Sequence, residues 1–357
     1  MANGIMKSVQ RGTVTIAAGQ TTGTATITSV NAAKALLITN WLNEPLNGNN
    51  ASVTFAGITL TNGTTVTATR NTSDASNACT VNFSIIEFAA SAIKSMQYGT
   101  ISLTSAQTSN TATISSVNTG NASVFWLGST SAYTNSAPSD CLTGVQLTNS
   151  TTVTALINTA VAAQTVYYVV CEFNSGILQS AAQQKTVTVT SGSTGTASIT
   201  SVNAGNSILA YGGATCNSSV GIDNFYVTLT NGTTLTSTSG ESSTLTRNSY
   251  CTVLEFPSGT FNSSVQRGSV QMANNTTSGT ATISSVNTAN SSINFTGWYD
   301  DETANARSVN FPTVALTNST TVTISRGASF ADVVTAGYEV AEWVIAPLTQ
   351  GNMLMVF

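Results

Sequence analysis

Histidine is absent from the 357 residues of this chain, and charged residues make up only 7% of it. Without histidine there is no Ser-His-Asp or Cys-His catalysis, and the commonest general base and transition-metal ligand are missing. Ordinary globular proteins are about 25% charged, whereas here Thr, Ser and Asn fill the polar positions. The composition therefore argues against an enzyme, and we expect no catalytic residues.

The sequence also lacks the signals of a membrane protein, a nucleic-acid binder, a nucleotide enzyme and a secreted protein. No apolar run approaches the ~18 residues of a membrane span. The ten basic residues are spread thinly and the net charge is −4, so there is no basic patch for a nucleic acid. No Walker-type or dinucleotide-type glycine loop is present. The start of the chain has no apolar signal-peptide core. We expect no cofactor, no membrane or nucleic-acid partner, and synthesis in a cytoplasm.

A six-residue pattern, Leu-Thr-Asn-Gly/Ser-Thr-Thr, organises the chain. It begins at Leu60, Leu147, Leu229 and Leu316, so that successive leucines lie 87, 82 and 87 residues apart. Asn-Gly between two alternating apolar and Thr runs predicts a β-hairpin with a type I′ turn, a role that Asn-Ser performs less well. One hairpin repeated four times indicates one β-domain copied four times.

Strict alternation marks the first strand of each repeat, where residues such as Val14 and Ile16 are expected to face the core. The second strand, Thr24–Asn31 in the first repeat, breaks its alternation at Val30, which predicts a bulge or bend. Six or seven short strands per repeat, with turns every 8–12 residues, predict an all-β fold of four tandem Ig-like or jelly-roll-like antiparallel β-sandwich repeats of about 85 residues. The expected boundaries are 1–90, 91–176, 177–259 and 260–347, with a C-terminal tail at 348–357. Short connections predict a string of beads held close together.

The last strand of each repeat ends in a Glu-aromatic pair: Glu87-Phe88, Glu172-Phe173, Glu255-Phe256 and Glu342-Trp343. Two interpretations of this glutamate are open. It forms four equivalent ligand sites, or it terminates the strand and pairs with Arg11, Arg267 or a backbone amide. The structural interpretation is favoured, although Tyr98 takes the place of Arg11 in the second repeat.

Four segments differ in length and pattern between the repeats, at residues 40–52, 128–144, 212–224 and 297–312. Divergence within a repeated frame is typical of loops. Their aromatic residues are candidates for a surface that binds a sugar or a protein, or alternatively each plugs the end of its own sandwich. These residues are Trp41, Tyr133, Trp298 and Tyr299. The acidic cluster Asp300–Glu302 is either a solvated loop or a calcium site, and we expect no metal.

Five cysteines form an odd set without Cys-x-x-Cys spacing, at Cys79, Cys141, Cys171, Cys216 and Cys251. They fall at different places in the repeat, whereas a disulfide framework would recur with the domains. We interpret them as small buried apolar residues. Pairing of Cys141 with Cys171, or of Cys216 with Cys251, remains open.

The C-terminal tail looks like the first strand of a further repeat whose body is missing. Its apolar end is Met353, Leu354, Met355, Val356 and Phe357. We expect this strand to add to a sheet edge, in its own fourth repeat or in a neighbouring subunit. The alternative is a frayed apolar terminus.

Several of these motifs together resemble repeats in structural proteins of tailed bacteriophages, a class that includes tail-fibre, head-fibre and capsid decoration proteins. They are the Val-Gln-Arg-Gly opening at Val9, the Thr-rich first strands, the Ser-Val-Asn step, the Leu-Thr-Asn hairpin and the closing Glu-Phe pair. The resemblance covers essentially the whole chain, four times over. The third repeat departs from it, with Gln184-Lys185 in place of Arg-Gly.

The resemblance implies a non-enzymatic virion protein, assembled in the host cytoplasm and displayed on the particle as a capsid decoration or head-fibre protein. Its implied partners are major capsid or tail proteins, further copies of itself, and a host surface glycan. One alternative is a tail-fibre or tail-tip adhesin that binds host glycan, although four equal repeats without a shaft argue against it. A second is a bacterial surface-layer-like adhesin, for which a secretion signal is expected.

Overall fold

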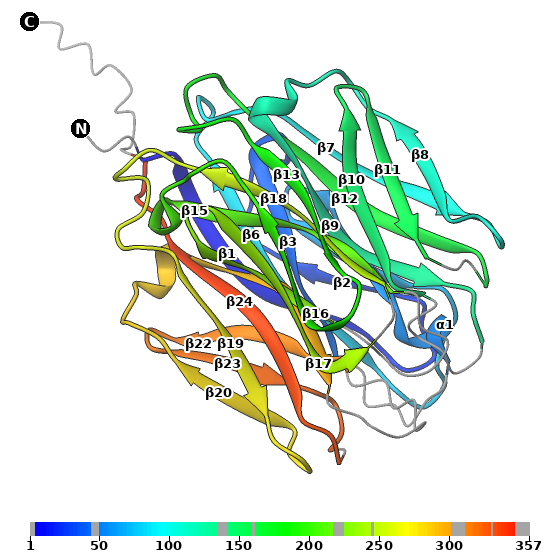
Figure 1. The fold of residues 1–357 in the computed structure, drawn as a ribbon. Coiled ribbons are helices and arrows are strands. Elements are labelled where there is room, and N and C mark those ends of the chain that lie inside the picture. The colour runs from blue at the N-terminus through cyan, green and yellow to red at the C-terminus, as the bar shows by residue number, and fades with distance from the viewer. Residues whose placement is uncertain are drawn as a thin grey trace, which may run out of the picture.

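A computed structural model describes residues 4–43, 50–134, 141–158, 161–216, 225–243, 246–300, 311–329 and 331–346. Over these residues the chain is all-β, built from antiparallel strands in five hydrogen-bonded sheets (Figure 1). Short 3-10 turns and the four-residue helix α1 (Ala51–Thr54) are the helical segments described. The expected fold class is therefore confirmed at the level of an all-β protein with several antiparallel sheets.

The described strands fall into four consecutive sets of six, which we call units 1 to 4. Unit 1 comprises β1 (Met6–Ile16), β2 (Thr22–Thr26), β3 (Ala35–Asn43), β4 (Ala56–Asn62), β5 (Thr65–Arg70) and β6 (Cys79–Phe88). Unit 2 comprises β7 (Ile93–Leu103), β8 (Ser109–Thr113), β9 (Ala122–Ser131), β10 (Thr143–Asn149), β11 (Thr152–Ile157) and β12 (Gln164–Phe173). Unit 3 comprises β13 (Gln183–Val189), β14 (Gly192–Ser198), β15 (Ser207–Cys216), β16 (Phe225–Asn231), β17 (Thr234–Ser243) and β18 (Arg247–Glu255). Unit 4 comprises β19 (Gln266–Met272), β20 (Ser278–Thr282), β21 (Ser291–Asp300), β22 (Thr313–Asn318), β23 (Thr321–Ser325) and β24 (Val334–Glu342).

The same pairing recurs in every unit. The sixth strand lies between the first and the third, and the fifth strand lies between the second and the fourth. The first strands show the expected alternation, since Val14 and Ile16 are fully buried between exposed threonines. The second strand is shorter than expected, because β2 ends at Thr26. Beyond it, the amides of Ile27 and Val30 still donate to the carbonyls of Thr64 and Gly63.

Neighbouring units share sheets, unlike beads on a string. The fourth strand of one unit bridges to the third strand of the next, through Gly57 to Gly128, Gly144 to Gly213, and Tyr226 to Gly297. Three six-stranded sheets result, each containing strands from two units. The Ig-like or jelly-roll-like assignment of the individual repeats and their boundaries stay predictions.

Unit 4 packs against unit 1, with β22 and β21 against β3. Trp41 explains why β22 and β3 form no ladder here. It holds the position of Gly128, Gly213 and Gly297 in the other third strands, and like them it has a positive φ, of 67°. A Cβ atom at Gly128 would lie 2.3 Å from the carbonyl oxygen of Ala56 across the bridge. A side chain at this position therefore prevents the bridge. β22 and β3 pack without a ladder, and hydrogen bonds from the Arg11 and Ser84 side chains to unit 4 cross this junction instead.

The aromatic residues of the Glu-aromatic pairs meet in a closed quartet, one residue from each unit. Neighbouring ring centroids are 5.5 to 5.7 Å apart and neighbouring planes are inclined by 81° to 84°, the edge-to-face arrangement that aromatic pairs favour. We call this set the closing quartet: Phe88, Phe173, Phe256 and Trp343. The contact of Phe88 with Trp343 joins unit 1 to unit 4, so the four units form a closed ring.

A second closed quartet comes from the third strands. Its centroid separations around the circuit are 4.4, 6.3, 6.0 and 5.8 Å. We call this set the strand quartet: Trp41, Trp126, Tyr211 and Phe295. When the repeats are aligned by sequence, Thr39 corresponds to Trp126. The aromatic residue that unit 1 contributes is instead Trp41, two residues after Thr39, because its left-handed backbone conformation turns the Trp41 ring inward against Trp126.

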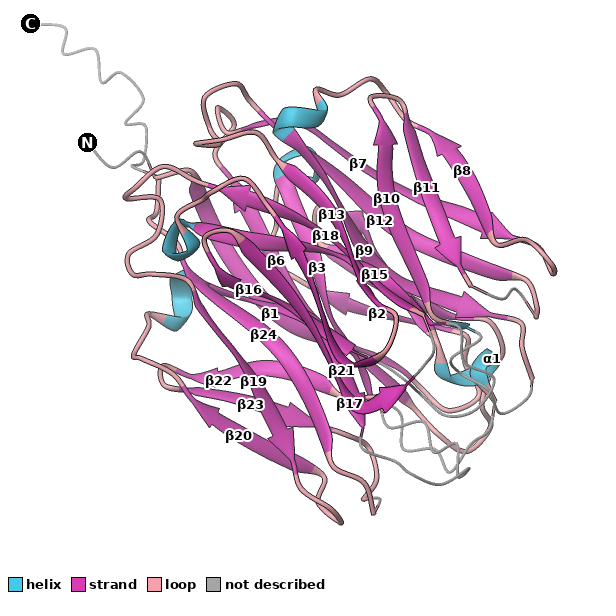
Figure 2. Ribbon diagram, viewed as in Figure 1, coloured by secondary structure: helices cyan, strands magenta, loops and turns pink. Residues whose placement is uncertain are grey.

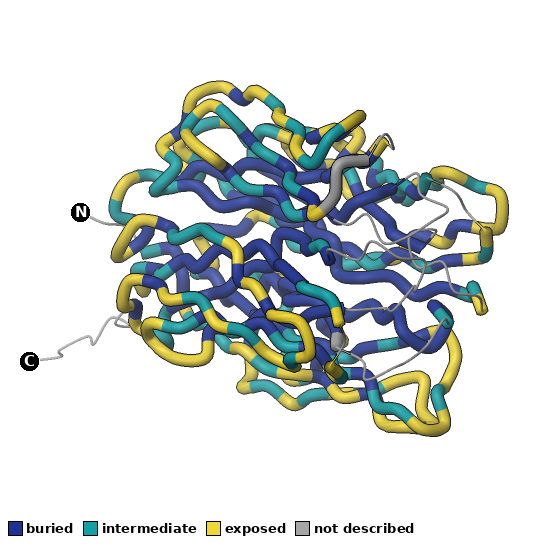
Figure 3. Tube along the Cα trace, turned by 60° about the horizontal axis from the view of Figure 1, so that its bottom comes forward, coloured by how far each residue is buried: buried dark blue, intermediate teal, exposed yellow. Residues whose placement is uncertain are grey.

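The ring has two different ends. The four 3-10 turns, each begun by an asparagine, gather at one end, whereas α1 lies at the other (Figure 2). The Leu-Thr-Asn hairpins share the first end, as the amide of Val30 donates to the carbonyl of Gly63 at 2.8 Å. We call this the Asn-turn end and the opposite one the loop end. The strands between the ends are buried, and exposed residues concentrate in the turns and outer strands (Figure 3).

The hairpin turns are not of type I′. Neither Asn62 nor Gly63 has a positive φ. The side-chain oxygen of Asn62 instead accepts from the amide of Thr64 at 2.9 Å, which is an Asx turn. The side-chain oxygens of Asn149, Asn231 and Asn318 accept the same bond from the amide two residues later. Because the following residue does not have a positive φ, the turn does not require Gly, and Ser150 and Ser319 hold this position in units 2 and 4.

Ring closure predicts energetic coupling between Phe88 and Trp343, which are 255 residues apart in sequence (343 − 88). In a double-mutant cycle with Phe88→Leu and Trp343→Leu, we expect a coupling energy of about 0.5–1.5 kcal/mol by urea unfolding. The matched control is the diagonal pair Phe88 and Phe256, for which coupling of less than about 0.5 kcal/mol is expected. Equal coupling in both cycles would contradict the quartet.

Candidate functional site

The recurring glutamate is held by groups of its own unit. In unit 2, Glu172 accepts from the amide of Asn118 at 2.8 Å, from the Nζ of Lys94 at 2.9 Å and from the hydroxyl of Ser95 at 3.1 Å. Glu87 in unit 1 has the corresponding partners Asn31, Lys7 and Ser8. The carboxylate thus fixes the amide at the start of the 3-10 turn. These contacts agree with the favoured interpretation, in which the recurring glutamate has a structural role.

Units 3 and 4 vary this arrangement. Glu255 accepts from the amide of Asn203 and from the hydroxyl of Ser180, both at 2.7 Å. Glu342 accepts from the side-chain amide of Asn262 at 3.4 Å. The expected backbone-amide partner is therefore confirmed in three units, whereas Arg11 and Arg267 bond elsewhere.

The glutamine of the opening motif also recurs with a fixed role. Gln10 donates from Nε2 to the carbonyl of Thr28 at 2.8 Å, and its Oε1 accepts from the amide of the same residue at 2.8 Å. Gln97, Gln183 and Gln266 make the same pair of bonds in the other units. The side chain acts as one rung of a β-ladder and fixes the segment that follows the second strand.

The next residue of the opening motif reaches the preceding unit. Arg267 of unit 4 donates to the carbonyls of Ala204 and Ser207 in unit 3. Arg11 of unit 1 donates in the same way to Thr288 and Ser291 in unit 4, across the ring closure. Burial lowers the pKa of Arg11 from its usual value. These side chains connect the units.

Two of the four candidate surface aromatics are buried. Trp41 lies in β3 and Trp298 in β21, and each is only 3% exposed. Their expected position in exposed loops is therefore wrong, because both side chains turn inward and pack on Phe311. This corresponds to the alternative in which the aromatic residues plug the fold.

Tyr133 and Tyr299 are half-buried. Tyr299 lies near the end of β21 and stacks on Tyr226, with centroids 5.9 Å apart and planes inclined by 17°. Tyr133 follows β9 and packs against the core, while its carbonyl accepts from the amide of Ser52 in α1 at 2.9 Å. The candidate strand Met353 to Phe357 lies outside the described residues.

Two buried arginines that the motifs did not single out organise the loop end. Arg70, 1% exposed, donates to the carbonyls of Gln20 at 3.0 Å, Ala17 at 3.2 Å and Val53 at 3.3 Å. Arg326 donates in a similar way to Thr276 at 2.9 Å. Both arginines follow the hairpin leucine at the same spacing (60 to 70 and 316 to 326), a signal present in the sequence.

The described residues gather no three His, Cys, Asp or Glu side chains that could hold a metal ion. Asp301 and Glu302 lie outside them, so the acidic cluster is not tested. All five cysteines are buried and outside disulfide bonds, which confirms their interpretation as small buried residues and excludes the two pairings left open. Burial and the charge of Glu339 raise the pKa of Cys251 to about 12, so this thiol is inert at neutral pH.

The strand quartet leaves almost no space at its centre. The cavity lined by Trp41, Trp126, Tyr211 and Phe295 has a volume of about 10 Å³. That is about the volume needed for one water molecule. Within the described residues no helix is long and apolar enough to cross a membrane.

Comparison with known proteins gives no family. No family model matches the chain, and no curated protein matches it. Three solved viral proteins align over most of the chain at 11% identity. The first, from the triple jelly roll fold and turret assembly of an archaeal virus, covers 96% of this chain and 92% of that chain with a TM-score of 0.11. The VP2 subviral particle of infectious bursal disease virus covers 96% of this chain and 83% of that chain with a TM-score of 0.13, and a chain of Sulfolobus turreted icosahedral virus covers 95% and 92% with a TM-score of 0.10. TM-scores this low show no shared fold.

The capping glutamate predicts a pH dependence of stability. Burial alone raises the pKa of Glu172, but the bonds from Asn118, Lys94 and Ser95 outweigh it, so that its pKa lies below the usual value. A carboxyl with a lowered folded-state pKa stabilises the fold above its unfolded pKa of about 4.3, and this stabilisation is lost as the pH falls through the folded pKa. At pH 7 we expect Glu172→Gln to lower the free energy of unfolding by roughly 2 kcal/mol.

Urea unfolding at a series of pH values between 7 and 3 tests this expectation. The difference between wild type and Glu172→Gln should be constant above about pH 5 and shrink below about pH 4. Lys94→Ala is the matched control. The Lys94 side chain is 58% exposed, so its loss should cost less than about 1 kcal/mol. A pH-independent difference for Glu172→Gln would contradict the capping role.

Proposed function

We propose that this chain is a non-enzymatic structural protein of a tailed-bacteriophage virion, displayed on the particle as a capsid decoration or head-fibre protein. One observation carries the proposal: the residues that recur in the units are engaged in building the ring. The recurring Glu and Gln fix backbone groups, and the recurring aromatic residues form the closing quartet. Repetition here serves construction, and the motifs that resemble phage virion repeats are the same ones.

The polarity of the ring supports display on a surface. The segments that diverge between units begin and end at the loop end, whereas the constant turns and hairpins lie at the Asn-turn end. Met6 of β1 also meets the segment that follows β24 at the Asn-turn end, where Met6 bridges to Ile345 and the amide of Ala346 donates to the carbonyl of Met6 at 2.6 Å. A constant end suits attachment to a repeated capsid lattice, and a variable end suits exposure.

Each unit is best understood as one six-stranded sandwich repeat, with a sheet of first, sixth and third strands facing a sheet of second, fifth and fourth strands. The ring then combines four such repeats into one rigid block. The proposed partners are major capsid proteins below the Asn-turn end and further copies on the lattice.

Electron cryo-microscopy of intact virions tests the proposal. We expect density for a compact four-unit ring on the icosahedral shell, at hexamer centres or three-fold positions, with the loop end outward. Density at the tail or baseplate would overturn the decoration role in favour of an adhesin. If purified virions lack this protein, both the decoration role and the adhesin role are wrong.

A specific feature favours the adhesin as the second candidate. Tyr226 and Tyr299 form a half-exposed parallel pair near the loop end, and aromatic faces are suited to stacking on sugar rings. We expect glycan-array binding that is lost in Tyr299→Ala if this function holds. Tyr133→Ala, at the same end but packed on the core, is the matched control. The absence of any glycan signal would argue for the decoration role.

A further inference from the structure

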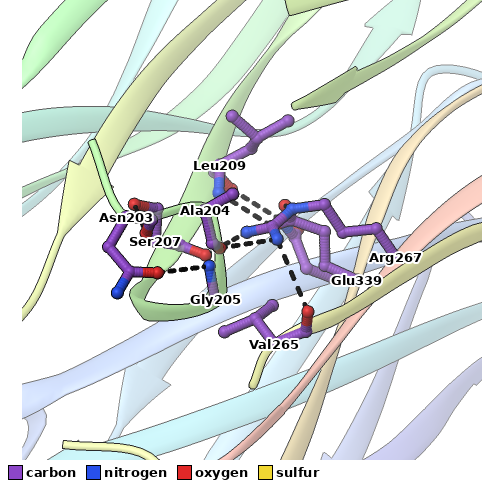
Figure 4. Close-up of polar contacts among 9 residues, drawn as sticks. Asn203, Ala204, Gly205, Ser207, Leu209, Val265, Arg267 and Glu339 are labelled. Carbon is purple, nitrogen blue, oxygen red and sulfur yellow. Dashed lines mark hydrogen bonds and ion pairs between the residues drawn. The ribbon is translucent and has the colours of Figure 1, made fainter. Parts of the chain in front are cut away.

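The contacts of Arg267 show which groups accept hydrogen bonds from a guanidinium at a junction between units. Its side chain, 11% exposed, donates to the carbonyls of Ala204 at 2.7 Å and of Ser207, and forms an ion pair with Glu339 at 2.6 Å (Figure 4). The carbonyl of Val265, in its own unit, lies 3.4 Å away. Backbone carbonyls at the start of the preceding third strand are thus the main acceptors.

Two further junctions supply their own donor at the corresponding position. Arg11 donates to Thr288 and Ser291 across the ring closure. Tyr98 donates its hydroxyl to the carbonyl of Ala35 at 2.7 Å, between units 2 and 1. Three of the four junctions therefore place a hydrogen-bond donor on the carbonyl that opens the third strand.

The junction between units 2 and 3 is different. Here Gln184 holds the position of Arg267, and its Oε1 turns to the amide of Leu147, from which it accepts at 2.9 Å. A cleft of about 550 Å³ lies at this junction. Its lining includes Thr119 and Ala122, which correspond to Ala204 and Ser207.

The remaining partners of Arg267 also have counterparts in the cleft. Ala182 corresponds to Val265, as each precedes the recurring glutamine. Thr252 corresponds to Glu339, because Gln184 pairs with Thr252 as Arg267 pairs with Glu339. The whole environment of the guanidinium is therefore repeated, with a neutral residue in place of the acid. Arg11 shows that an acid is not required, since it pairs with Ser84.

We propose that this cleft binds the guanidinium of an arginine side chain presented by a partner polypeptide. The planar group carries five donors in a fixed fork, which suits the set of carbonyls that accepts from Arg267 better than an ammonium does, and the cleft repeats the residues of that set. Gln184 is exposed, so the cleft is open to an incoming side chain. The inference does not depend on the virion assignment.

Titration with N-acetyl-arginine amide, followed by amide NMR of the isotope-labelled protein, tests the site. We expect saturable shifts at Gly120 and Ala122 with a dissociation constant on the order of 1 mM. The neutral analogue N-acetyl-citrulline amide should produce none. The probe is added to a 50-fold excess over the protein, up to a probe concentration of about 20 mM. If no amide shifts at that concentration, the proposal is wrong.

Two variants make the test reciprocal. Gln184→Arg should fill the cleft from within, abolish the shifts and raise the midpoint of thermal unfolding by about 2 °C. The double variant Arg267→Gln with Glu339→Thr reproduces the open junction between units 3 and 4, and should gain a second set of shifts at Gly205. Binding that persists unchanged in Gln184→Arg would place the ligand elsewhere and contradict the site.

The source of the guanidinium is distinguished by a peptide arm. An arginine flanked by Thr and Ser in a six-residue peptide should bind at least fivefold more tightly than the free amide if the occupant is a polypeptide. Equal affinity would assign the cleft to small guanidinium compounds and overturn the partner part of the proposal. Replacing the peptide arginine by lysine should weaken binding at least threefold.

Discussion

The closing quartet is the contact on which the rest of the structure depends. Phe88, Phe173, Phe256 and Trp343 each come from the end of a sixth strand, and each edge-to-face contact joins two units. Because the circuit includes Phe88 and Trp343, it closes only when unit 4 returns to unit 1. The bonds of Arg11 to Thr288 and Ser291 in unit 4 depend on that closure.

The scarcity of charge agrees with this construction. The recurring polar side chains bond mainly to the backbone, as Gln10 does to Thr28 and Asn62 does to Thr64. Neutral side chains perform this role with little desolvation cost. The buried Arg70 is surrounded by carbonyls. The ring is therefore built mainly from neutral side chains, alongside ion pairs such as those of Lys94 with Glu172 and of Arg267 with Glu339.

The sequence predicted what depends on residues close together in the chain. The buried alternation of Val14 and Ile16, and the hairpin at Leu60, were readable from local pattern. Ring closure was not, because a period of two assigns a face to a residue but does not tell what covers that face. Trp41 was misplaced for a related reason: a tryptophan with the backbone conformation of Gly128 leaves no local signal. Arg11 was expected near Glu87, but its partners belong to unit 4.

Small-angle X-ray scattering of the monomer, separated by size and checked for a mass of 36.6 kDa, tests ring closure most directly. A compact chain of this length should have a radius of gyration of about 20 Å. Four separate sandwich domains in a row should instead give roughly 35 Å, from the dimensions of single domains of this size. The account predicts the smaller value. A radius near the larger value would show that unit 4 does not return to unit 1.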